Sequence, residues 1–105
     1  MTLDQLPDLD PDPEETLSAE VALTDDVLVK VFALGPGASV PPHEHPDSTN
    51  VFHVLRGAPT VVRDTVEEPV PAPGVVVNER GAVHGLFNEG EDVAVVTASF
   101  SPTPG

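Results

Sequence analysis

Two of the four histidines stand close together in a proline-rich stretch, where residues 41–46 read Pro-Pro-His-Glu-His-Pro. In an extended chain, successive side chains point to opposite faces, so His43 and His45 share one face. On an α-helix the same two residues would lie roughly 200° apart around the axis. The flanking prolines exclude a helix and leave a strand end or a loop. The spacing therefore indicates half of a metal site, whose other half must come from elsewhere in the chain.

The rest of the chain predicts an all-β domain. Short valine-rich runs alternate with Gly, Pro, Asn and Asp, and no segment is convincingly helical. The strand predicted at 27–34 is apolar on both faces apart from Lys30, so we expect it to be covered on both sides. Residues 65–73 read as a Pro-rich linker with Glu67 and Glu68 exposed. Further strands are expected at 20–23, 51–56, 60–64, 75–78, within 81–88 and at 93–100. About eight short strands favour a sandwich or a barrel.

The charge balance restricts the partners. Eighteen acidic residues face four basic ones, and the net charge is −14 over 105 residues. Such a charge repels phosphate backbones and anionic membranes, so we expect neither a nucleic-acid nor a membrane partner. One interpretation is an acidic surface suited to very high salt, where screening removes the self-repulsion. The other is a disordered acidic tail on an ordinary domain. The two can hold together.

The length predicts one domain with an N-terminal extension. Residues 1–16 alternate Asp and Pro and predict a solvated acidic arm, although Leu3, Leu6 and Leu9 could pin it to a neighbouring surface. A single barrel domain over 17–101 and a tail over 102–105 follow. Cysteine is absent, which excludes disulfides and thiol chemistry. No membrane-length apolar run and no signal-peptide pattern is present, so a cytoplasmic location is expected.

The second half of the metal site is expected from His84 and Asn88. They lie four residues apart and therefore on one face of a strand. Three histidines from two separated strands can bind one divalent ion, since imidazole suits Zn, Fe, Ni and Cu. A three-histidine set leaves coordination positions open, as catalytic rather than structural sites do.

In these motifs the sequence resembles the cupin superfamily, whose fold is a double-stranded β-helix or jelly-roll barrel. The family's first motif runs Gly, five residues, His-x-His, three or four residues, Glu, six residues, Gly. Gly37, His43, His45 and Gly57 follow it, with Asn50 in the Glu place.

The family's second motif runs Gly, five residues, Pro-x-Gly, two residues, His, three residues, Asn. Gly81, His84 and Asn88 match its second half. Glu79 occupies the Pro position, and Gly74 sits one residue late. The two motifs span residues 37–88, and the flanking strands extend the resemblance to most of the chain.

The resemblance implies that His43, His45 and His84 bind a divalent metal ion (Fe, Ni, Mn or Zn), with Asn50 in the place of the fourth ligand. Because Asn is neutral, the site lacks one negative charge. Metal affinity should fall, while the pull of the ion on a bound water or an anionic substrate should rise. Three-histidine iron sites in some cupins, such as thiol dioxygenases, work without that carboxylate.

Other residues near the motifs predict supporting roles. His53 should face away from the cavity, whereas Phe52 shares the face of Asn50 and should line it. Asp47 is the nearest candidate for a replacement carboxylate. Asn88 reads either as a strand-end residue or as a hydrogen-bonding group inside the barrel.

Two functions remain open at this point. One is a metal-dependent, oxygenase-like oxidoreductase acting on a small organic molecule. The other is a non-catalytic module that binds a small ligand in the barrel cavity. No general acid or base is identifiable from the sequence. Since small members of the family are commonly dimeric, the resemblance also implies a homodimer formed through sheet edges and outer faces.

Overall fold

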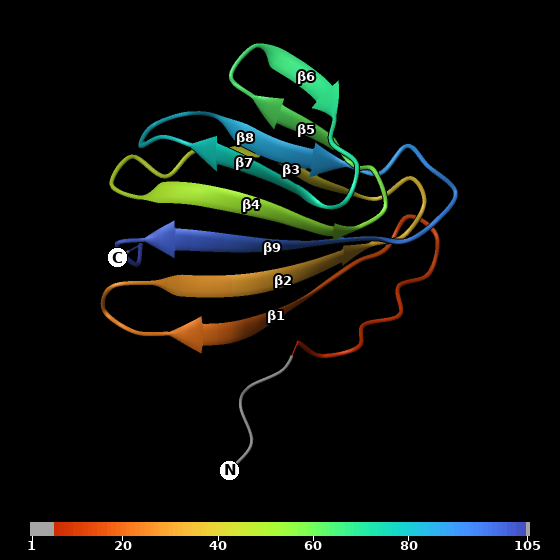
Figure 1. The fold of residues 1–105 in the computed structure, drawn as a ribbon, viewed down its shortest axis with the longest axis horizontal. Coiled ribbons are helices and arrows are strands. Elements are labelled where there is room, and N and C mark those ends of the chain that lie inside the picture. Colours follow the sequence, from red (N-terminus) through yellow and green to blue (C-terminus); the bar gives the residue numbers. More distant parts are fainter. Residues whose placement is uncertain (1–5, 105) are drawn as a thin grey trace.

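Residues 6–104 are described by the computed structural model and form nine β-strands in two antiparallel sheets (Figure 1). In the five-stranded sheet the strand order is β1 (Thr16–Leu23), β2 (Leu28–Leu34), β9 (Ala94–Ser101), β4 (Thr49–Arg56) and β7 (Gly74–Asn78). In the four-stranded sheet the order is β3 (Ser39–His43), β8 (His84–Phe87), β5 (Thr60–Arg63) and β6 (Val66–Pro69). Across this part of the chain, no helix has the length and apolar character needed to cross a membrane.

From β3 onward the chain passes repeatedly between the sheets, because β3, β5, β6 and β8 lie in one and β4, β7 and β9 in the other. This winding produces the double-stranded β-helix. The all-β prediction is therefore confirmed.

The hydrophobic core lies between the two sheets. Along β9 every second side chain is buried, and these are Ala94, Val96, Ala98 and Phe100. Leu34, Phe52 and Val54 join the cluster from neighbouring strands of the same sheet, and Val61 and Leu86 join it from the facing sheet. Strand alternation explains the pattern, since one face of each strand meets the core. Full burial of a Leu or Phe side chain contributes roughly 1.5–3 kcal/mol relative to exposure.

The linker predicted at 65–73 is wrong in its first half. Val66–Pro69 form β6, which pairs with β5 in the register Val62↔Glu67. All four β6 residues are exposed, so the strand has no alternation of apolar and polar positions that could reveal it. Its hairpin turns at Asp64, whose φ is 54°. Strand β1 also starts earlier than expected, at Thr16.

The described part of the N-terminal arm lies against the barrel. The Glu14 amide donates to the Pro36 carbonyl at 2.7 Å, and the Gly35 amide donates to the Glu15 carbonyl at 2.9 Å. A Cβ on Gly35 would collide with the Asp12 carbonyl oxygen. Farther out, Leu6 and Leu9 line a hollow together with residues of β2, β4 and β9, including Val31, Ala33, Leu55 and Val95. The arm thus reaches the outer face of the five-stranded sheet, and β2 is covered on both sides as expected. Leu3 lies outside the described residues.

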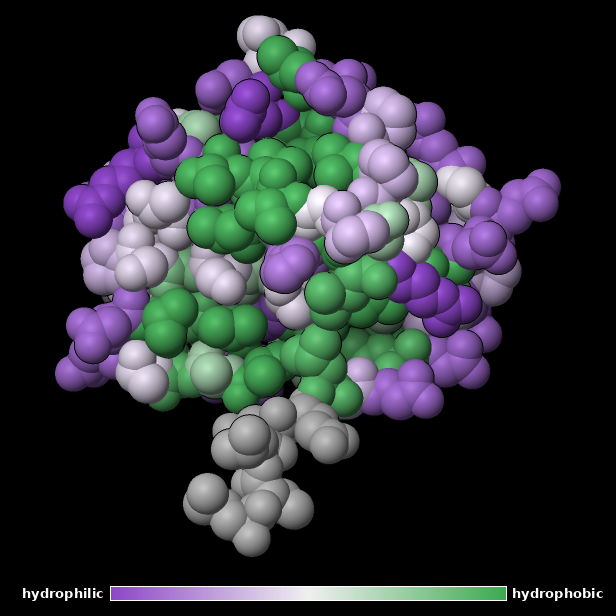
Figure 2. Space-filling model, in the orientation of Figure 1, coloured by the Kyte–Doolittle hydropathy of each residue, from purple (hydrophilic) through white to green (hydrophobic). Residues whose placement is uncertain are grey.

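Apolar side chains also gather on the face of the molecule seen in Figure 2, where hydrophilic side chains surround them. Val75 and Val77 of β7 are 59% and 48% exposed. Strand β7 ends its sheet, and a cleft of about 320 Å³ separates it from the β5–β6 hairpin. Valines make up most of the cleft lining, and no histidine lies among the lining residues.

Candidate metal centre

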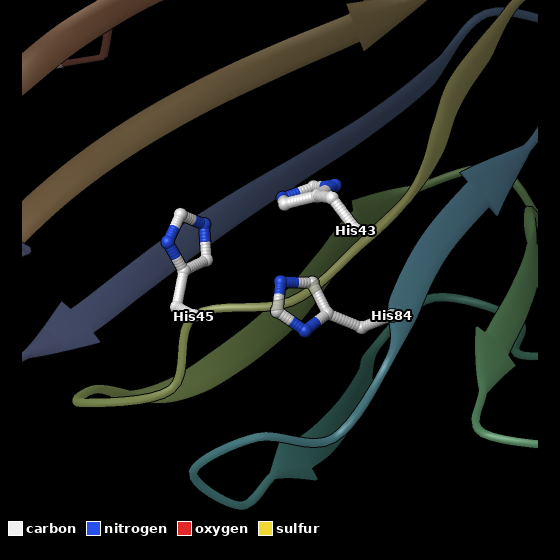
Figure 3. A group of neighbouring side chains, drawn as sticks. All are labelled: His43, His45 and His84. Atoms are coloured by element: carbon white, nitrogen blue, oxygen red, sulfur yellow. The ribbon is translucent and has the colours of Figure 1, made fainter.

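His43 and His45, which stand close together in the chain, meet the distant His84 where β3 pairs with β8 (Figure 3). His43 ends β3, His45 follows in the next loop, and His84 begins β8. One ring nitrogen from each lies within 4.8 Å of the others. The ring centroids are 4.5 Å apart for His43 and His84, and 5.0 Å apart for His43 and His45. His45 and His84 are 5.5 Å apart.

The pairing of β3 with β8 sets the position of two of these rings. His43 and His84 are direct partners in the antiparallel register. The register shifts between Val40 and His43, so Pro41 and Pro42, which have no amide hydrogen, occupy an irregular segment where no donor is needed. This backbone passes very close to β8. A Cβ on Gly85 would lie 2.9 Å from the Val40 carbonyl oxygen and 3.0 Å from the Pro42 nitrogen. Only glycine fits beside His84 without moving β3.

His45 reaches the site from a loop, because β3 ends at His43, and this agrees with the strand end or loop expected from the flanking prolines. The carbonyl of His45 accepts hydrogen bonds from the amides of Gly81 at 3.2 Å and Ser48 at 3.4 Å. Gly81 has φ +80°, a left-handed conformation that favours glycine. The imidazole packs edge-on against the Phe100 ring at 4.7 Å. The loop is therefore held from both sides.

The surroundings of His84 leave one ring nitrogen free for a ligand. Its side chain is 2% exposed, and Nδ1 lies 3.1 Å from the Ala82 carbonyl oxygen. Since a carbonyl can only accept, Nδ1 carries the hydrogen and donates it, which leaves a lone pair on Nε2. This Nε2 is buried and has no hydrogen-bond partner among the described residues. An unpaired buried polar atom costs roughly 1–3 kcal/mol. A metal ion held by all three imidazoles would satisfy it.

The protonation states of His84 and His45 suit them as metal ligands. Burial lowers the pKa of His84 to about 4; the Ala82 carbonyl raises it, and His43 and His45 lower it further. Burial, then His43, then the Lys30 ammonium lower the pKa of His45. His43 is the most exposed of the three, and its Nδ1 lies 2.9 Å from the Pro41 carbonyl oxygen. At neutral pH His84 therefore holds a free lone pair, as metal binding requires.

Asn50 is fully buried on β4, opposite Asn78 on β7. Asn78 Nδ2 donates to Asn50 Oδ1 at 2.8 Å, and Asn50 Nδ2 donates to the Ser99 carbonyl at 3.4 Å. Asn78 Oδ1 is buried without a partner among residues 6–104. Sequence reasoning missed Asn78, and its signal was a polar residue ending the apolar run Val75-Val76-Val77. Coordination by Asn50 would have to use the second lone pair of Oδ1.

The other residues singled out in the sequence lie at different distances from the histidine group. The Phe52 ring lies 5.6 Å from the His84 ring, whereas His53 is exposed. Asn88 Nδ2 donates to the carbonyls of Leu34 and Asp92, so its amide secures a turn outside the histidine group. Asp47 is exposed, and among the described residues no carboxylate joins the group.

The fold and the site together define a class. A double-stranded β-helix with a His-x-His pair at the end of one strand and a third histidine on the paired strand is the arrangement of the cupin superfamily. The sequence model of the cupin domain matches residues 30–100, which include all three histidines. The chain belongs to the cupin family.

Several solved structures are similar to this chain. TT1209 from Thermus thermophilus superposes with a TM-score of 0.85, at 26% identity over 91% of each chain. An uncharacterised double-stranded β-helix protein from Klebsiella pneumoniae gives a TM-score of 0.84 at 23% identity, covering 92% of this chain and 86% of that one, and supports the fold alone. A recombinant oxalate oxidase in complex with glycolate gives 0.76 at 28% identity, covering 89% of this chain and 54% of that one.

A curated sequence relative is germin-like protein 1-1 from Oryza sativa subsp. japonica. It is 37% identical over 71 residues, which are 63% of this chain and 33% of the relative. The chain thus spans about a third of the length of this curated relative.

Proposed function

We propose that this protein is a metal-dependent, oxygenase-like enzyme that acts on a small organic molecule. One Fe, Ni, Mn or Zn ion would be held by His43, His45 and His84. The observation that carries the proposal is the convergence of three ring nitrogens within 4.8 Å, one of them the buried, unpartnered Nε2 of His84. The likeness to an oxalate oxidase supports the oxidoreductase assignment.

The bound ion would polarise a substrate oxygen and provide open coordination positions. The chain's own residues prepare the site for this. The low pKa of His84 keeps its nitrogen unprotonated, and Phe52 and Phe100 form apolar walls against the imidazoles. We include Asn50 in the proposal as a neutral fourth donor, which would leave the ion with its full charge.

A binding module without catalysis is the second candidate. The observation that favours it is the lack of a carboxylate in the histidine group of residues 6–104. Without a carboxylate in that group, general acid–base catalysis would have to come from another side chain, the substrate or a bound water.

Metal analysis of protein purified without chelator or affinity tag tests the proposal. We expect close to one metal ion per chain in the wild type and in His53→Ala, whose histidine is exposed. In His84→Ala the metal should be lost. The absence of bound metal after incubation with Fe(II), Ni(II), Mn(II) and Zn(II) would contradict the metal site. Bound metal without oxygen consumption on any small organic substrate would favour the binding module.

We also propose a homodimer through the β6 and β7 edges. Val66, Val75 and Val77 are exposed there, and Arg63 and Glu68 line the same cleft. In a two-fold interface Arg63 of each copy can face Glu68 of the other. Sedimentation analysis should show a dimer for the wild type and a monomer for Val75→Lys. A wild-type monomer would contradict this proposal.

A further inference from the structure

Lys30 is a cation on the inner face of the barrel. Its neighbours at alternate positions on β2 are Leu28, Phe32 and Leu34, which belong to the core cluster or pack against it. Side chains two apart on a strand share a face, so Lys30 shares theirs. The register confirms this, because Lys30 pairs with Ala98 of β9, whose side chain is fully buried. Lys30 itself is half-buried.

This inner face leads directly to the histidines. Leu28 and Lys30 pair with Phe100 and Ala98, which are successive inward residues of β9. The Phe100 ring packs edge-on against the His45 imidazole, with the ring centroids 4.7 Å apart. In Figure 3 His45 lies over the β9 ribbon.

The charges at this place do not balance. The three imidazoles are neutral as ligands, and no carboxylate joins them within the described residues. A divalent ion together with Lys30 would bring three positive charges. Glu20 is the cross-strand neighbour of Lys30, but it is exposed on the edge strand β1, so water screens its attraction. The other three basic residues, Arg56, Arg63 and Arg80, are all exposed. What the site lacks is an anion.

We propose that Lys30 is a specificity residue that binds the carboxylate of an anionic organic substrate held at the histidine site. The inference rests on the proposed function and narrows its substrate class to small organic acids. A charge-assisted hydrogen bond contributes roughly 1.5–3 kcal/mol, so its loss weakens binding by about tenfold or more.

Calorimetric titration of Zn(II)-loaded protein with glycolate and with the neutral isostere glycolamide tests the inference. The wild type should bind glycolate about tenfold or more tightly than glycolamide at fixed ionic strength. Lys30→Gln should weaken that preference, because only the charge of the ion then favours the anion, and Lys30→Arg should keep most of it. Arg56→Gln makes the same change in net charge at an exposed position and should match the wild type.

Metal content and melting temperature of each variant separate the possible failures. If Lys30→Gln holds metal, melts like the wild type and prefers glycolate as strongly as the wild type does, the inference is overturned while the proposed function stands. A wild type that holds metal but does not prefer glycolate also overturns the inference alone. A wild type that holds no metal overturns the proposed function and the inference with it.

Discussion

At the scale of single residues, His84 shows how one environment serves both stability and binding. Burial disfavours its protonated form, while the Ala82 carbonyl fixes the hydrogen on Nδ1. The cost is an unpartnered Nε2 in the interior. A metal ion bound to Nε2 would remove this cost, so metal binding should stabilise the folded protein.

The His84 environment predicts a pH dependence of the metal-free protein. Its folded-state pKa, about 4, lies below the ordinary value of 6.5, so the unfolded chain binds the proton more readily. The associated stability is present above pH 6.5 and is lost as the pH falls toward 4. The loss should be no more than about 3 kcal/mol. Urea unfolding from pH 7 to 4.5 measures it. His84→Asn should lose less stability than the wild type over this range, and equal losses would contradict the assignment.

Because Asn50 is neutral, we expect that a carboxylate at position 50 would change both the stability of the protein and its response to metal. Asn50→Asp has the same shape, but its carboxylate would face the Ser99 carbonyl and lose that hydrogen bond. Without metal the variant should melt below the wild type, because a buried charge is poorly compensated. Zn(II) should raise its melting temperature more than that of the wild type, since the carboxylate offsets the charge of the ion. Equal metal-induced shifts would show that residue 50 does not act on the ion.

At the scale of elements, the site depends on the contact between β3 and β8. The irregular Pro41–Pro42 segment lies against Gly85, and this contact sets the distance between His43 and His84. Gly85→Ala should push β3 away from β8 and cost roughly 1–3 kcal/mol of stability. Zinc affinity should fall with it, as measured by competition with a chelator.

Gly90→Ala is the matched control. A Cβ at Gly90 would meet only Asn88 Oδ1, at 3.5 Å, an ordinary contact. Its stability and zinc affinity should stay close to those of the wild type. If Gly85→Ala binds zinc as tightly as Gly90→Ala does, the spacing of β3 and β8 does not control the site.

The sequence is most informative where burial produces a pattern. Strands β2, β4 and β9 are readable because their apolar residues meet the core. Strand β7 is readable from its run of valines, although only Val76 packs against the core. Strand β6 has no buried residue and is readable only by its pairing with β5, which is a property of the fold. The spacing of His43 and His45 indicates a shared site, but the loop that delivers His45 depends on the Gly81 amide, 36 residues away. The orientation of Lys30 likewise follows from its register with β9.

At the scale of the whole molecule, the acidic charge is spread over the surface. Six of the eighteen acidic residues lie in residues 1–16 and twelve in residues 17–101. Every Asp and Glu among residues 6–104 is exposed. The arm alone therefore does not account for the charge, and repulsion acts across the barrel itself.

This distribution predicts that salt stabilises the protein. The screening length falls from about 10 Å at 0.1 M to about 3 Å at 1 M, so the melting temperature should rise over that range. Asp8→Asn/Asp10→Asn in the arm and Glu89→Gln/Glu91→Gln in the barrel remove the same charge and should reduce the salt dependence equally. Greatest stability at low salt would contradict the prediction, and an effect confined to the arm variant would favour the tail interpretation.

The most direct test of the central claim is a crystal structure of the zinc-loaded protein with anomalous scattering at the metal edge. We predict one metal peak at roughly 2.0–2.1 Å from a ring nitrogen of each of His43, His45 and His84, with Nε2 as the donor atom of His84. The same map would show whether Asn50 Oδ1 approaches the ion. A metal bound elsewhere, or a His84 ring whose Nε2 points away from the ion, would contradict the account.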